Sequence, residues 1–108
     1  MNVYVISNPA FEGWVKVGKT TDVRMRVASM QSGVPHIHRY KVEMLAEFVD
    51  DVPVHWELED QKIERSGEWF KCSKQQAMDA VRKVIAEYDS FDEMVENQRA
   101  RAIEDGWL

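Results

Sequence analysis

Five side chains within the first 26 residues have the types and spacing that chemistry on a phosphate group requires. Lys19 and Thr20 stand directly before a predicted helix, and a lysine and a hydroxyl beside a helix N-terminus can bind phosphate. Arg26 lies within that helix, where a guanidinium can bind two phosphate oxygens at once. Tyr4 and Lys16 precede the helix. A phenol is a poor base near neutral pH unless a neighbouring cation favours its ionised form, and Lys16 is the cation we expect there.

Tyr4, Arg26 and the nearby Gly18 also have purely structural explanations. Tyr4 can be a β-favouring aromatic side chain that fills the core. Gly18 suits a point where the backbone passes close to a ligand or another strand, but it can also be a plain glycine at a strand end. Arg26 can be an exposed helix arginine that pairs with Asp22 or Glu12. Taken one at a time, these residues leave both interpretations open.

Two strands and a helix must position these side chains. Residues 2–7 are apolar and β-branched, which predicts a strand. Residues 14–18 alternate apolar side chains with Lys16, which predicts a second strand, antiparallel to the first because the connection is short. Asp22, with the two threonines before it, is a candidate helix N-cap. Apolar residues then recur at helical spacing until Gly33, a predicted C-cap.

The rest of the chain predicts an α+β fold. Residues 39–48 have a partial two-residue period and predict a third strand, and residues 68–72 predict a short fourth one. Between them, a helix is expected from residues 50–51 to about residue 64. Capping boxes at Ser73 and Ser90 predict two C-terminal helices, the last ending at Gly106. The predicted order is ββαβαβαα, a small, mostly antiparallel sheet flanked by helices.

This arrangement resembles the core of the GIY-YIG nuclease superfamily. It is more similar to the small phage and fungal branch, whose second motif V-K-[IV]-G-K-T matches residues 15–20, VKVGKT. Residues 67–70, GEWF, match the strand that closes this branch, with two aromatic residues covering the sheet and Glu68 within reach of the site. The resemblance covers residues 2–72. It implies a metal-dependent DNA endonuclease that hydrolyses phosphodiester bonds with Mg²⁺ or Mn²⁺.

The resemblance also implies roles for single residues. Tyr4 takes the position of the first-motif tyrosine, and Arg26 that of the arginine that stabilises the transition state. Lys16 stands where most of the superfamily has a second tyrosine, although lysine is usual in the phage branch. Asn2 replaces the first-motif glycine. The implied catalytic residues are therefore Tyr4, Lys16, Arg26 and Glu57.

The metal ligand implied by the resemblance is a single glutamate on the helix after the third strand. Glu57 is our choice because residues 55–58, HWEL, best match that helix of the branch. Asp51 and Glu59 are the alternatives, and a shift of one helical turn would exchange them. One carboxylate with waters and phosphate oxygens is enough for Mg²⁺, which keeps much of its hydration shell. Any one of these acidic residues can otherwise be part of a solvated helix face.

Basic, polar and small residues around the site are expected to contact the nucleic acid. They follow the second strand, the first helix and the loop after it. Each can also be an ordinary surface residue. The predicted nucleic-acid-binding residues are Gly18, Lys19, Thr20, Arg24, His36, His38 and Arg39.

Charge is distributed unevenly along the chain. The net charge is -5, with six basic and two acidic residues in positions 1–41 and eight basic and seventeen acidic residues in positions 42–108. A polyanion such as DNA is therefore expected to meet the first segment. Two other functions stay open. One is a catalytically degenerate GIY-YIG fold that binds DNA or a protein without cutting, and the other is a phage-encoded inhibitor whose acidic segment mimics a polyanion to block a host protein.

Composition limits the remaining possibilities. Cys72 is the single cysteine, so an internal disulfide and a cysteine-based zinc site are excluded. No apolar run approaches the roughly 18 residues of a membrane span, and we expect no signal peptide and no membrane partner. The expected location is the cytoplasm, or the host cytoplasm for a phage-encoded protein.

One compact domain with a C-terminal extension is expected from the length. We place a GIY-YIG-like domain at residues 1–88 and a C-terminal helix at residues 89–108. The apolar stripe of that helix either packs on the core or forms a homodimer contact, since isolated helices of this length need partners. The stripe consists of Phe91, Met94, Val95 and Ile103.

Overall fold

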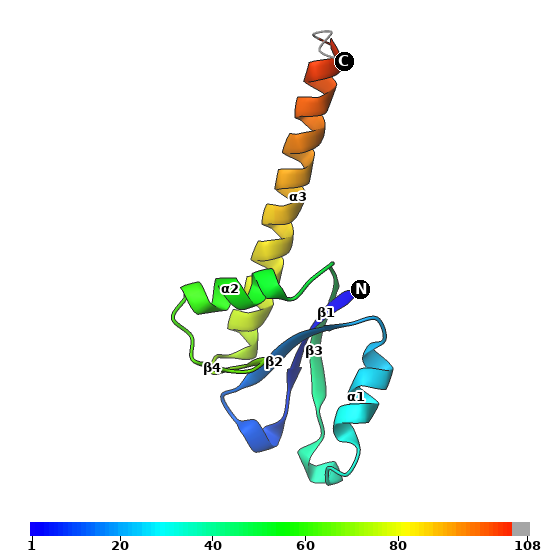
Figure 1. Ribbon diagram of the computed structural model, residues 1–108. Helices are drawn as coiled ribbons and strands as arrows, with labels where there is room; N and C mark the ends of the chain where they lie inside the picture. The colour runs from blue at the N-terminus through cyan, green and yellow to red at the C-terminus, as the bar shows by residue number, and fades with distance from the viewer. Residues whose placement is uncertain (105–108) are drawn as a thin grey trace.

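A computed structural model describes the backbone of residues 1–104 and the side chains of residues 1–90 (Figure 1). In this part of the chain, five strands form one antiparallel sheet in the order β3-β1-β2-β5-β4, and three α-helices flank it, which confirms the predicted fold class. The strands are β1 (Asn2–Ser7), β2 (Val15–Thr20), β3 (Lys41–Glu47), β4 (Arg65–Ser66) and β5 (Trp69–Phe70). The helices are α1 (Val23–Gln31), α2 (Val52–Asp60) and α3 (Lys74–Glu104), with 3-10 turns at Pro9–Phe11 and His36–His38.

The β1–β2 hairpin determines which side chains share a face of the sheet. Tyr4 is paired with Gly18, and Ile6 with Lys16. Because side chains alternate between the two faces of a strand, these four residues lie on one face. Their neighbours along the strands lie on the other face.

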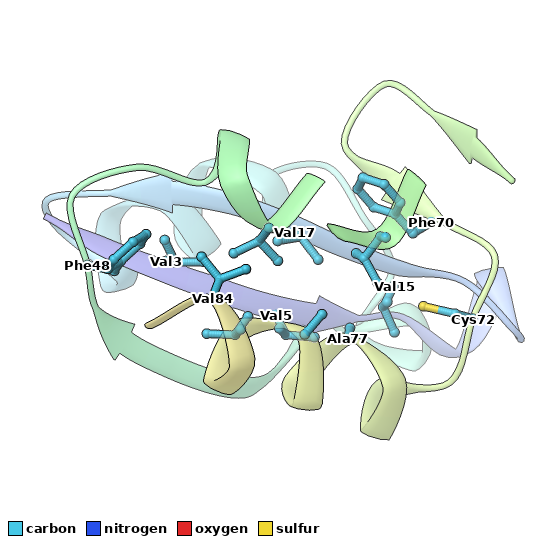
Figure 2. Close-up of a cluster of buried hydrophobic side chains, with 13 residues drawn as sticks. Val3, Val5, Val15, Val17, Phe48, Phe70, Cys72, Ala77 and Val84 are labelled. Carbon is cyan, nitrogen blue, oxygen red and sulfur yellow. The ribbon is translucent and has the colours of Figure 1, made fainter. Parts of the chain in front are cut away.

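The hydrophobic core lies between that other face and helices α2 and α3 (Figure 2). The strands contribute a row of valines with exposed fractions of 3% or less. Val54 and Leu58 of α2 and Ala77 and Val81 of α3 pack against this row. The row consists of Val3, Val5, Val15 and Val17.

α1 covers the Tyr4 face of the sheet much more loosely. The Asp22 side chain caps its N-terminus by accepting a hydrogen bond from the Met25 amide at 3.2 Å. Gly33, with a φ of +76°, follows its C-cap residue in the left-handed conformation that glycine favours. None of the nine α1 residues, all of which the structure describes, is buried.

The largest differences from the predicted elements lie at α2, at the β4–β5 hairpin and at α3. α2 ends at Asp60 rather than near residue 64, and Lys62 follows with a φ of +63°. Residues 65–70 then form a hairpin of two-residue strands, of which only the second was predicted. Finally, α3 is one continuous helix, because the capping signal at Ser90 lacks a helix-breaking glycine or proline to reinforce it.

The division of the chain at residue 88 stays a prediction, although α3 passes through it without a break. Phe91, Met94, Val95 and Ile103 lie outside the described side chains, and Gly106 lies outside the described residues. No helix in the described part of the chain combines the length and apolarity that crossing a membrane requires.

Candidate functional site

Tyr4 and Gly18 form the centre of the candidate site. Tyr4 has an exposed fraction of 0% and lies opposite Gly18 in the β1–β2 ladder, outside the hydrophobic core. A Cβ atom on residue 18 would lie 2.4 Å from the Tyr4 hydroxyl oxygen and 2.6 Å from its Cζ atom. Gly18 is thus required for a close approach of the tyrosine ring to β2, and is not simply a strand-end glycine.

The Tyr4 hydroxyl is buried and has no hydrogen-bond partner among the described residues. The Arg26 guanidinium is near enough to favour the ionised phenol, but it makes no hydrogen bond of good geometry with the hydroxyl. Burial outweighs this cation, and the Glu68 carboxylate adds to burial, so the pKa of Tyr4 is raised. Arg26 is thus a cation that favours the ionised phenol, whereas the same role for Lys16 stays a prediction.

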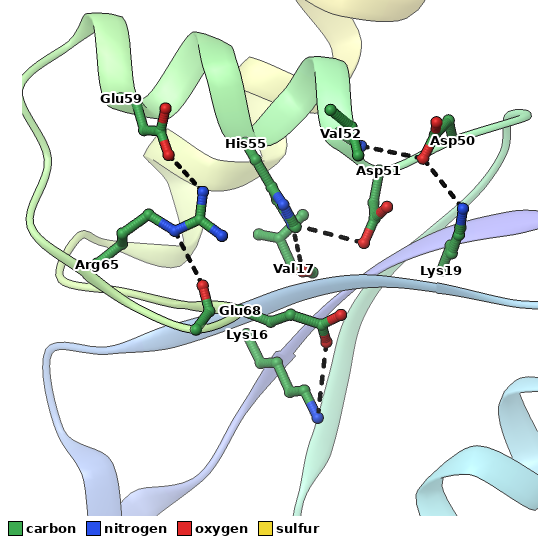
Figure 3. A network of polar contacts seen from close by, with 11 residues as sticks. Lys16, Val17, Lys19, Asp50, Asp51, Val52, His55, Glu59, Arg65 and Glu68 are labelled. Atoms are coloured by element: carbon green, nitrogen blue, oxygen red, sulfur yellow. Dashed lines mark hydrogen bonds and ion pairs between the residues drawn. The ribbon is translucent and has the colours of Figure 1, made fainter.

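Lys16 and Glu68 lie side by side next to Tyr4. The Lys16 Nζ atom is 3.8 Å from the Glu68 Oε2 atom, and the side chains point toward one another in Figure 3. Glu68 Oε2 would also lie 2.9 Å from a Cβ atom on Gly18, so this carboxylate extends over the glycine. Burial lowers the pKa of Lys16, and Glu68 partly opposes that shift.

Arg26 projects from α1 toward this group. Within residues 1–90 it makes no ion pair with Asp22 or Glu12, the partners expected for an ordinary exposed helix arginine. Asp22 caps α1 instead. The guanidinium therefore remains available for an anion while it lies beside the Tyr4 ring.

A buried acidic residue reaches the site region from α2. Asp51 has an exposed fraction of 4%, and its Oδ2 atom lies 3.5 Å from the Nε2 atom of His55. That nitrogen also lies 2.7 Å from the Val17 carbonyl oxygen, which can only accept, so Nε2 carries a proton (Figure 3). Burial raises the pKa of Asp51, and Glu68 adds to the shift. Asp51 is also near enough to Tyr4 to raise the pKa of the phenol.

The structure does not bring Glu57 to this group. Its Oε1 atom accepts hydrogen bonds from Lys83 of α3 at 2.8 Å and from Gln61 at 3.1 Å. These bonds lower the pKa of Glu57. Glu59 pairs with Arg65. The role of Glu57 as catalytic residue and metal ligand stays a prediction, and in the structure its carboxylate faces α3.

Metal binding stays a prediction. Among the described residues, no group of three or more histidine, cysteine, aspartate or glutamate side chains could hold a metal ion. The carboxylates that act electrostatically on Tyr4 are Glu68 and Asp51. A single carboxylate with several waters fits the needs of Mg²⁺, and Glu68 is the more accessible, with a side-chain exposure of 38% against 6%.

Two of the predicted nucleic-acid-binding side chains are engaged within the protein. The Lys19 Nζ atom lies 3.2 Å from Asp50 Oδ1. The Thr20 hydroxyl accepts a hydrogen bond from the Asp22 amide at 3.2 Å. Of the remaining predicted residues, Arg24, His36 and Arg39 are exposed, His38 is half-buried and Gly18 is buried.

Comparison with known proteins identifies a family for most of the chain. The sequence model of the T5orf172 domain matches residues 1–85, which include Tyr4, Lys16, Gly18, Arg26 and Glu68. T5orf172 domains are found in phage and fungal endonuclease-like proteins, which indicates a role related to nucleic acids. No curated protein and no solved structure matches the chain. The chain belongs to the T5orf172 domain family.

Proposed function

We propose that this protein is a small, metal-dependent DNA endonuclease of the GIY-YIG type. The observation that carries the proposal is the buried, unpartnered Tyr4 hydroxyl held over Gly18 and beside Arg26. Leaving a buried hydroxyl unpaired costs about 1–3 kcal/mol. Groups that violate local rules in this way are expected at functional sites, and the family match supports a nucleic-acid ligand.

Arg26 is the phosphate-binding group in this proposal. Its exposed guanidinium can donate two hydrogen bonds to phosphate oxygens and stabilise the charge that develops there. The Tyr4 hydroxyl has no exposed surface, so it would donate a hydrogen bond to the same phosphate only once the side chains that cover it move on binding.

We propose Lys16, rather than Tyr4, as the group that accepts a proton. Burial acts in opposite directions on the two groups, raising the pKa of Tyr4 and lowering that of Lys16. Once Lys16 has lost its proton, its amine can take one from the attacking water while the water oxygen bonds to phosphorus. The bond from phosphorus to the leaving oxygen then breaks, the leaving oxygen takes a proton from a second water, and Tyr4 remains a hydrogen-bond donor.

Glu68 is the residue that we propose to hold the divalent cation, in place of Glu57. Its carboxylate lies over Gly18 and is only loosely paired, at 3.8 Å from Lys16. When bound there, the cation would neutralise charge on the phosphate. Asp51 is the second carboxylate of this region, and its burial suits support of the site more than direct ligation.

A DNA-binding module that does not cut is the second candidate. The raised pKa of Tyr4 favours it, because burial disfavours the ionised phenol that would act as a base. It would keep the phosphate contact of Arg26 without proton transfer.

A cleavage assay separates the two candidates. Plasmid and branched DNA would be incubated with Mg²⁺ or Mn²⁺, with a chelator in a parallel reaction. We expect nicking that requires the metal, that Arg26→Ala abolishes and that Arg82→Ala retains, because Arg82 is an exposed α3 arginine bonded to Asp79. Cleavage by Arg26→Ala would contradict the proposed mechanism, and DNA binding without cleavage would establish the second candidate.

A further inference from the structure

A cluster of aromatic side chains lies at the surface around Trp69 of β5, the residue paired with Lys16 of β2. The Trp69 ring meets Phe11 edge to face, with centroids 5.2 Å apart, and Tyr40 at 6.4 Å. Phe11, Trp14, Ser66 and Trp69 line a hollow of about 190 Å³. Phe11 is 47% exposed, and none of these aromatic residues belongs to the core described for residues 1–90.

The strand register places this hollow beside the candidate active site. Trp69 is paired with Lys16 across the β2–β5 ladder, and directly opposed side chains share a face of a sheet. Gly18, two residues farther along β2, is paired with Tyr4. Two residues of a strand span about 6.6 Å. A phosphate bound at Tyr4 and Arg26 would therefore bring an adjoining part of its own strand to the aromatic hollow.

The chemistry of the hollow suits an unpaired nucleobase. Bases stack on aromatic side chains, and only an unstacked base has free faces for such contacts. An adjoining groove of the surface is lined by three basic residues, Arg39, Lys41 and Lys74, and two acidic ones, Glu12 and Glu43. Lys41 and Lys74 pair with Glu43 at 3.8 and 3.5 Å, whereas Arg39 makes no ion pair among the described residues. Positive charge beside a stacking platform is the combination that single-stranded nucleic acid requires.

We propose that Phe11, Trp14 and Trp69 form a binding pocket for an unpaired nucleobase next to the phosphate held by Arg26. The pocket makes the protein selective for DNA with a single-stranded, bulged or branched element over fully paired duplex. This inference rests on the proposed function, because it takes the position of the phosphate from it. It assigns a binding role to Trp69. From the GEWF motif alone, this residue was expected only to cover the sheet.

The test measures binding without cleavage. Affinities would be measured in a chelator for a duplex with one bulged 2-aminopurine and for the same duplex fully paired. Phe11→Ala and Trp69→Ala are expected to weaken binding of the bulged duplex roughly tenfold. In the wild type, stacking in the pocket should quench the 2-aminopurine fluorescence, and both variants should restore it. Both variants should bind the paired duplex like the wild type. Trp56→Ala, which removes a 61% exposed tryptophan of α2, is the matched control and should change neither affinity.

Two further results make the outcome decisive. Trp69→Phe keeps a stacking ring and should retain most of the bulge preference, which separates stacking from loss of fold. Equal weakening on both duplexes, or no effect of Phe11→Ala and Trp69→Ala, would overturn the pocket while leaving the proposed function intact. A wild-type protein that binds neither duplex would instead contradict the proposed function itself, and the pocket with it.

Discussion

The two faces of the central sheet are built from the same strands but serve different purposes. On one face, Val3, Val5 and Val17 pack against two helices in a dry core. On the other face, Tyr4 and Lys16 lie beneath a helix that has no buried residue of its own among the nine described. Alternation along β1 and β2 therefore places a rigid support directly behind the candidate reactive groups.

The difference explains how a short chain can tolerate a polar site with an unpartnered buried hydroxyl. The core face supplies the apolar burial that stabilises the fold, whereas the α1 face carries an unpartnered hydroxyl and a lysine whose pKa burial lowers. Functional sites held on rigid elements are more precise than sites on loops. We therefore expect substitutions on the two faces to separate stability from activity.

The largest expected effect is on the core face. Phe70→Ala removes a fully buried ring that packs against His55 and should lower the free energy of unfolding by about 3–5 kcal/mol. Phe11→Ala, at a 47% exposed position, should lower it by less than about 1 kcal/mol. Urea denaturation measures both, and similar losses would contradict the separation.

The next effect tests the close approach of Tyr4 to Gly18. Gly18→Ala places a methyl group 2.4 Å from the tyrosine hydroxyl and should destabilise the fold by about 1–3 kcal/mol. A double-mutant cycle with Tyr4→Leu, which removes the opposing atoms, should show that the two losses are not additive. Additive losses would mean that the ring does not lie over this glycine.

A smaller change in stability is expected from Tyr4→Phe. This variant removes only the unpaired hydroxyl, so the unfolding free energy should stay constant or rise by up to about 1 kcal/mol. Cleavage should fall steeply at the same time. Denaturation and cleavage measured on one preparation give the answer, and a clear loss of stability would show that the hydroxyl has a structural partner.

The smallest effect belongs to Glu57→Gln. The Lys83 and Gln61 hydrogen bonds lower the folded-state pKa of Glu57 below its ordinary value of 4.5. The carboxylate therefore contributes stability above that value and loses it as the pH falls through the lowered pKa. We expect a slightly lower melting temperature at pH 7 and no difference once the pH is below the lowered pKa.

The same variant tests the metal ligand. Cleavage and its metal dependence should be unchanged in Glu57→Gln and lost in Glu68→Gln. The opposite pattern would restore Glu57 as the metal ligand and overturn the assignment to Glu68.

Spacing along a hairpin could be read from the sequence, whereas helix rotation could not. Tyr4, Gly18 and Arg26 come together because a short turn fixes the register of β1 and β2 and Asp22 fixes the start of α1. The choice among Asp51, Glu57 and Glu59 stayed open because several acidic residues occur in and next to α2 and the sequence does not define which turn faces the sheet.

Long-range pairing was equally hidden in the sequence. The β4–β5 hairpin has strands of two residues, too short for any periodic pattern. The contact of Phe11 with Trp69 joins residues far apart in the chain, and it depends on that hairpin. The aromatic hollow was therefore visible only in the structure.

The most direct test of the account is an NMR titration with a short DNA duplex in a chelator, observed through side chains. We predict that the Arg26 Nε resonance shifts with a salt-dependent affinity, while the methyl groups of Val54 and Leu58 in the core stay unperturbed. Shifts confined to the α2 and α3 side chains, with Arg26 unchanged, would contradict the assignment of the reactive face.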